Sequence, residues 1–83
     1  MKTIRYSIAA DRALARMPTR QAAKIEAKID QLAFAPESLV GNVKRLRGTS
    51  VFRLRVDDYR VLFDEDGIIL DILDVGPRGG IYG

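Results

Sequence analysis

The spacing of apolar residues changes once along the chain, and this change limits the folds that the chain can adopt. Between residues 19 and 34, the apolar side chains recur every three or four positions and predict one buried helix face, made of Ala22, Ile25, Ile29 and Leu32. From residue 50 onward, apolar and polar residues alternate, which is typical of half-buried strands. Helices followed by strands predict the α+β class, with the helices on one face of a sheet.

The first half of the chain carries further signals of element boundaries. Residues 2–8 alternate and predict a first strand, whose buried face would carry Ile4, Tyr6 and Ile8. We expect Asp11 to cap a short helix that ends near Pro18, and Thr19 to cap the longer helix. Because Pro36 follows the apolar stripe, we interpret residues 35–43 as a linker. The two helices would form a hairpin.

The second half of the chain predicts three strands joined by tight turns. In the first of them, one set of side chains would face the helices, namely Phe52, Leu54 and Val56. Asp57-Asp58 predicts the first turn, residues 59–63 the second strand, residues 64–67 the next turn and residues 68–75 the third strand. We therefore expect a single domain over residues 1–83. It would consist of an N-terminal strand and a two-helix hairpin packed on a mainly antiparallel four-stranded sheet, whose other face stays uncovered.

Composition excludes several classes of site. The 83 residues include no cysteine, so disulfides and thiolate metal sites are ruled out, and we expect neither a metal nor a cofactor. They also include no histidine, the commonest acid–base catalyst near neutral pH, so catalysis would have to come from Arg, Lys, Tyr, Asp or Glu. No apolar run approaches the roughly 18 residues of a membrane span, and the charged N-terminus does not have the pattern of a signal peptide. We expect a cytoplasmic protein.

Basic residues are concentrated in one short stretch, which holds Lys44, Arg45, Arg47, Arg53, Arg55 and Arg60. On a strand, Arg53 and Arg55 share one face, and Arg60 begins the next strand across a tight turn, so the three guanidinium groups should lie close together. Arginine binds phosphate oxygens through two parallel hydrogen bonds and keeps its charge, so this cluster favours an RNA backbone as ligand. The alternative is that these arginines form ion pairs with Asp57, Asp58, Asp64 or Asp71 and only solvate the sheet.

Two motifs carry a family resemblance. These are Leu46-Arg47-Gly48 followed by the run from Phe52 to Phe63 (FRLRVDDYRVLF), and Val75-Gly76-Pro77-Arg78 followed by Ile81-Tyr82. Together with the strand–helix–helix order upstream, they make essentially the whole chain resemble the RelE-type toxins. The resemblance implies a metal-independent endoribonuclease that cuts messenger RNA in the ribosomal A site by attack of the RNA 2′-hydroxyl on its neighbouring phosphate.

The resemblance also assigns roles to individual residues. It implies that Arg60 contacts the scissile phosphate and that Arg78 stabilises the transition state and is a candidate proton donor. Tyr82 would be the general base or a platform on which a base of the message stacks. The basic residues upstream would hold the RNA backbone, with Arg53 and Arg55 as the basic pair and Lys44, Arg45 and Arg47 beside it.

Two other functions remain open at this point. Relatives of the ParE branch share the fold but poison DNA gyrase, and an inactive relative would act only as an RNA-binding module. Arg60, Arg78 and Tyr82 together favour the nuclease. The implied partners are a cognate antitoxin, the ribosome and messenger RNA, with no role for a membrane.

Overall fold

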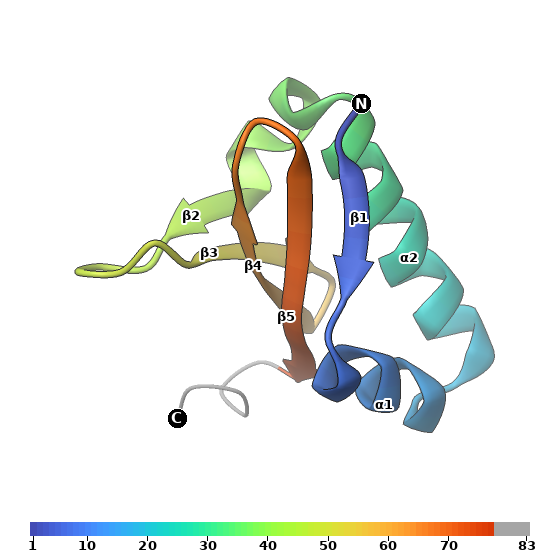
Figure 1. The fold of residues 1–83 in the computed structure, drawn as a ribbon. Coiled ribbons are helices and arrows are strands. Elements are labelled where there is room, and N and C mark those ends of the chain that lie inside the picture. The colour runs from blue at the N-terminus through green and yellow to red at the C-terminus, as the bar shows by residue number, and fades with distance from the viewer. Residues whose placement is uncertain (78–83) are drawn as a thin grey trace.

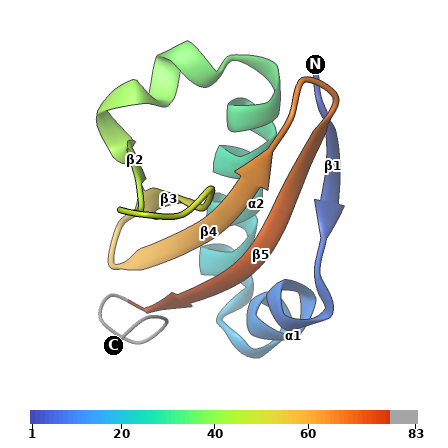
Figure 2. The ribbon, with the colours of Figure 1, turned by 60° about the vertical axis from the view of Figure 1, so that its left-hand side comes forward.

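Two helices lie against one face of a β-sheet in the computed structural model, which describes residues 1–77 (Figure 1). In chain order the elements are β1 (Thr3–Tyr6), α1 (Ile8–Arg16), α2 (Thr19–Phe34), the 3₁₀ helix η1 (Pro36–Asn42), β2 (Val43–Arg45), β3 (Phe52–Val56), β4 (Tyr59–Glu65) and β5 (Ile69–Pro77). Figure 2 shows α2 behind the strands and α1 at their lower end. The predicted α+β class and the helical hairpin on one face are confirmed.

The sheet has five strands in the order β1-β5-β4-β3-β2, one more than predicted. The additional strand, β2, begins at Val43, the last residue of the stretch that we interpreted as a linker. A strand of three residues is too short for alternation to be recognised, because a period of two needs at least four positions. The strands β2 to β5 pair antiparallel with their neighbours, whereas β1 pairs parallel with β5.

Several predicted boundaries are wrong by a few residues. The cap of α1 is Ser7, whose hydroxyl accepts a hydrogen bond from the Ala10 N–H at 3.0 Å, so Asp11 lies in the first turn instead. The helix therefore begins at Ile8, whose side chain is 71% exposed rather than buried in a strand. Helix α2 begins directly after Pro18, and Thr19 is its first residue and makes no cap. At the other end, β5 continues to Pro77.

The core lies between the helices and the sheet. Its fully buried large side chains are Ile25, Ile29, Leu54, Val61, Phe63, Leu70 and Ile72. The predicted helix stripe is confirmed, because Ile25, Ile29 and Leu32 are buried and Ala22 packs against them. The Phe63 ring stacks on Phe52, with 5.4 Å between ring centroids. Because the helices cover this face only, the side chains of the other face are left to solvent or to a ligand.

Candidate nucleic-acid interface

The register of β3 and β4 places two arginines side by side on the uncovered face. Asp57 and Asp58 form the turn, and Arg55 then lies directly opposite Arg60. Because Val56 and Tyr59 close this two-residue hairpin, the next pair of residues is of the non-hydrogen-bonded kind, with Cα atoms only about 4.5 Å apart. Arg55 is exposed and Arg60 is partly buried. The predicted proximity of these two arginines follows from this pairing.

The same face continues with basic residues onto β2. Lys44 pairs with Arg53, so their side chains also point to the uncovered side. A groove of about 710 Å³ runs along this hairpin and is lined by Lys44, Arg45, Leu46, Arg47, Gly48 and Arg53. The structure therefore brings the predicted phosphate-binding residues of the hairpin together around one groove, beside the Arg55–Arg60 pair.

Local hydrogen bonds fix the shape of the β2–β3 loop. Gly48 has a φ of 75°, a conformation that other residues rarely adopt. The Arg45 Nε donates to the Thr49 carbonyl oxygen at 2.9 Å, and the Thr49 hydroxyl donates to the Leu46 carbonyl oxygen at 2.9 Å. The loop thus has a defined shape, and its residues Leu46, Arg47 and Gly48 form part of the wall of the basic groove.

A salt bridge from α2 anchors the turn between the two arginine strands. Lys24 Nζ lies 2.7 Å from an Asp57 carboxylate oxygen, and the hydrogen bond from Lys24 lowers the pKa of the Asp57 carboxyl. Asp57 itself has a φ of 54°, in the left-handed region. Sequence reasoning placed Lys24 only on a helix flank, because nothing in the sequence relates it to a turn 33 residues away. Through this contact, α2 helps to hold Arg55 and Arg60 in place.

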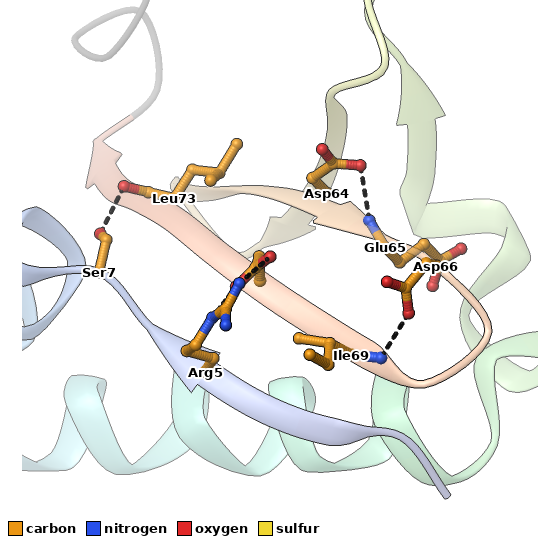
Figure 3. Close-up of polar contacts among 8 residues, drawn as sticks. Arg5, Ser7, Asp64, Glu65, Asp66, Ile69 and Leu73 are labelled. Atoms are coloured by element: carbon orange, nitrogen blue, oxygen red, sulfur yellow. Dashed lines mark hydrogen bonds and ion pairs between the residues drawn. The ribbon is translucent and has the colours of Figure 1, made fainter.

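The acidic residues gather at the other end of the uncovered face. Arg5 of β1 donates two hydrogen bonds to Asp71 of β5, at 2.6 and 3.0 Å (Figure 3). Asp64 pairs with Asp71 across β4 and β5, and Asp74 pairs with Leu62. Asp57 and Asp71, two of the carboxylates proposed as partners of the arginine cluster, thus form their salt bridges with Lys24 and Arg5 instead. The uncovered face is basic over β2, β3 and the start of β4, and acidic over the end of β4 and β5.

A second hollow, of about 330 Å³, lies where the helical hairpin meets the sheet. It is lined by Ala13, Arg16, Met17, Pro18, Tyr59, Val75, Gly76 and Pro77. Sequence reasoning did not predict it, because its walls come from three separate parts of the chain. Gly76 pairs with Arg60, so this hollow and the arginine pair adjoin the same end of β5.

Two of the predicted catalytic residues, Arg78 and Tyr82, lie outside the described residues. Within residues 1–77, no group of three or more acidic side chains is arranged to hold a metal ion. No helix in the same range is long and apolar enough to cross a membrane.

Comparisons with known proteins agree on the class. The family model described as the ParE toxin of type II toxin–antitoxin systems, parDE, matches residues 2–82. Among solved structures, the RelE–RelB complex of Pyrococcus horikoshii contains a chain with 25% identity and a TM-score of 0.79, over 95% of this chain and 97% of that one. The RelBE2 toxin–antitoxin complex of Mycobacterium tuberculosis contains a chain with 29% identity and a TM-score of 0.67, over 93% and 98%. YafQ of E. coli has the same fold, with a TM-score of 0.81 over the whole of both chains at 13% identity. A comparison with curated protein sequences gave no match.

The fold and its relatives define a toxin of the type II toxin–antitoxin systems, in the RelE/ParE superfamily. Within that superfamily, the chain belongs to the family of ParE toxins, whose model covers nearly its full length.

Proposed function

We propose that this toxin is a metal-independent endoribonuclease that cleaves messenger RNA in the ribosomal A site and thereby stops translation in the cytoplasm. The observation that supports the proposal most strongly is the Arg55–Arg60 pair, with Lys44 and Arg53 beside it on one uncovered face. Two adjacent guanidinium groups match the oxygen pairs of a phosphodiester, and the flanking cations match the neighbouring phosphates.

The proposed reaction uses a nucleophile from the substrate. The 2′-oxygen of the RNA forms a bond to the adjacent phosphorus, and the bond from phosphorus to the 5′-oxygen breaks. The 2′-hydroxyl proton passes to a base, and the leaving 5′-oxygen takes up a proton, which gives a 2′,3′-cyclic phosphate and a 5′-hydroxyl. The protein must align the attacking oxygen and stabilise charge on the phosphate, and neither task needs a histidine.

The roles divide among the arginines and one tyrosine. Arg60 contacts the scissile phosphate, while Arg53 and Arg55, together with Lys44, Arg45 and Arg47 of the groove, hold the RNA backbone. By the family resemblance, Arg78 stabilises the transition state and donates the proton to the leaving oxygen. Tyr82 is the general base or the stacking platform for a message base.

The proposed partner outside the ribosome is a cognate antitoxin. The relatives from Pyrococcus horikoshii and Mycobacterium tuberculosis were crystallised as complexes of a RelE-type and a RelB-type protein. A segment rich in Asp and Glu that folds on binding would cover the basic half of the uncovered face. Co-purification of this chain with the product of the adjacent reading frame tests the partner, and no complex at micromolar concentrations would contradict it.

The family model favours a second function, inhibition of DNA gyrase, because it is named for the ParE toxins. Two assays on one protein preparation separate the functions. Programmed ribosomes with end-labelled message should be cut at the A site, whereas supercoiling by gyrase should be unaffected. Arg60→Ala should lose the cleavage, and Arg12→Ala, which removes an exposed charge from α1 outside the basic groove, should retain it. Inhibition of gyrase without cleavage would refute the nuclease, and neither activity would indicate an inactive RNA-binding relative.

A further inference from the structure

The proposed function makes no use of the hollow where the helical hairpin meets the end of the sheet. Its walls come from the end of α1, the connection to α2, the start of β4 and the end of β5, and apart from Arg16 and Tyr59 they are apolar. Helix α1 packs against β5, and Figure 1 shows it at the lower end of that strand. The volume of about 330 Å³ lies at the lower end of the usual range for small-molecule pockets, roughly 300–1,000 Å³, and is suited to one flat ring system.

Two polar side chains line the hollow without a partner in the described part of the chain. Arg16 is exposed and Tyr59 is partly buried. Neither the Arg16 guanidinium nor the Tyr59 hydroxyl makes a hydrogen bond or an ion pair with another residue of the range 1–77. A mainly apolar pocket with a few polar groups that are free to bind is typical of a ligand site. A nucleobase fits this chemistry, because it has an apolar face and carries nitrogen and carbonyl acceptors on its edge.

Strand pairing places the hollow next to Arg60. Tyr59 and Arg60 are consecutive in β4, so their Cα atoms are about 3.8 Å apart and their side chains point to opposite faces of the sheet. On β5, Pro77 pairs with Tyr59 and Gly76 pairs with Arg60. Because Gly76 has no side chain, β5 adds no bulk beside Arg60 on the uncovered face. A nucleotide held by its phosphate at Arg60 is therefore close to the end of the sheet, beyond which the hollow lies.

We propose that this hollow binds one unpaired base of the RNA, namely the base next to the phosphate at Arg60. This inference rests on the proposed function, because RNA is the substrate there. The base lies among the side chains of Met17, Tyr59 and Pro77, and Arg16 donates hydrogen bonds to the acceptors on its edge. Unstacked bases are the parts of single-stranded RNA that proteins commonly bind in this way. Fixing the base also fixes its ribose beside the scissile phosphate, which helps to align the reacting oxygen.

The chain has two methionines, and they give a direct readout of the hollow. Met17 lines the hollow, whereas Met1 precedes β1 and is 87% exposed. The methionine methyl groups of the unmodified protein are labelled with ¹³C and followed by NMR. The probe is a trinucleotide with methoxy groups in place of its 2′-hydroxyls, so that it cannot be cleaved. A base in the hollow should shift the Met17 methyl signal through its ring current and leave the Met1 signal unchanged.

A trinucleotide backbone without bases separates base binding from phosphate binding. It keeps the phosphates that Arg60 and its neighbours attract, so it should still bind at low salt. Stacking of one base contributes roughly a 5–150-fold gain in affinity, so the abasic backbone should bind more weakly by about that factor. At saturation it should leave the Met17 signal unchanged.

A matched pair of variants tests Arg16. Arg16→Ala and Arg12→Ala each remove one exposed charge from α1, one helical turn apart, but Arg12 does not line the hollow. The trinucleotide should bind Arg16→Ala about 3–10-fold more weakly than Arg12→Ala, because only Arg16→Ala loses a hydrogen bond to the base. The melting temperature of each variant serves as the control for folding.

Three results would overturn the inference: no shift of the Met17 signal at millimolar trinucleotide, an equal shift with the abasic backbone, or equal losses of affinity in Arg16→Ala and Arg12→Ala. The base site and the nuclease can fail separately. A Met17 shift in a protein that does not cut message on programmed ribosomes would keep the base site and refute the nuclease. Cleavage without a Met17 shift would do the reverse.

Discussion

Replacement of Arg60 by alanine should slow single-turnover cleavage of ribosome-bound message by about 10²–10³, the usual cost of losing one donor to a developing oxyanion. The structure supports a loss of this size. An ion pair about 4 Å apart is worth about 4 kcal/mol at the effective dielectric constant of a protein surface. Arg60 is only partly exposed, so solvent reduces this value less than it would for an open side chain. A loss of about 3–4 kcal/mol corresponds to the expected slowing.

The two paired arginines differ in burial, and this difference predicts how much each contributes to the rate of cleavage. Arg55 is exposed, and exposed ion pairs contribute about 0–1 kcal/mol, so Arg55→Ala should slow cleavage by no more than about fivefold. Arg60→Lys should fall between the parent and Arg60→Ala, because lysine keeps the charge and loses the two-pronged grip on phosphate.

The assay is a single-turnover time course with programmed ribosomes, and the melting temperature of each variant serves as the control for folding. The reasoning is refuted if Arg60→Ala cleaves like the parent, or if Arg55→Ala costs as much as Arg60→Ala while both variants remain folded.

Three further predictions concern the core, a turn and the C-terminal tyrosine. Ile29 is fully buried, so Ile29→Ala should lower the free energy of unfolding by about 2–5 kcal/mol in a denaturant titration. Ile8 is 71% exposed, so Ile8→Ala should change the free energy of unfolding by no more than about 0.5 kcal/mol. Equal effects of the two substitutions would contradict the core assignment. Asp66 accepts hydrogen bonds from two backbone N–H groups in its own turn, and these bonds lower the pKa of the Asp66 carboxyl. Because the pKa in the folded state is below the unfolded value of about 3.9, this stabilisation is present above that pH and is lost as the pH falls through the folded value. Melting temperatures between about pH 2 and 6 should therefore fall less steeply in Asp66→Asn, and identical slopes would contradict the assignment. If Tyr82 is a general base, Tyr82→Phe should slow cleavage about 10²–10⁴-fold; if it stacks, Phe should cleave almost normally and Ala poorly, and no effect of either would leave Tyr82 without a role.

Local patterns predicted the parts of the fold that depend on neighbours in sequence. The stripe that contains Ile25, Ile29 and Leu32 had to form a buried helix face, because spacings of three and four residues align only on a helix. The proximity of Arg55 and Arg60 was predictable for a similar reason: a turn of two residues fixes the register of the strands on either side.

Features that depend on distant partners were not predictable in the same way. The strand β2 forms because β3 is there to pair with it, and its three residues have too little alternation to show this in advance. The salt bridge of Lys24 with Asp57 requires α2 to cross behind the β3–β4 turn, which no local pattern encodes. Ser7 and Asp11 are both acceptable caps by residue type. Ser7 is the cap because β1 ends there, with the last backbone hydrogen bond from β1 to β5 made by the Ser7 N–H.

The division of the uncovered face into basic and acidic halves bears on how RNA could lie across it. A phosphate chain is attracted by Lys44, Arg53 and Arg55 and repelled by Asp64 and Asp74, so the favourable path runs across β2, β3 and the start of β4. That path ends at Arg60, where the basic half stops. A backbone that follows it would present its last bound phosphate to the more buried arginine of the pair. Repulsion from the acidic half would then keep the RNA from sliding further, so that one particular phosphate is held at Arg60. The fold itself would thus position the scissile phosphate for in-line attack, which an active site without histidine needs.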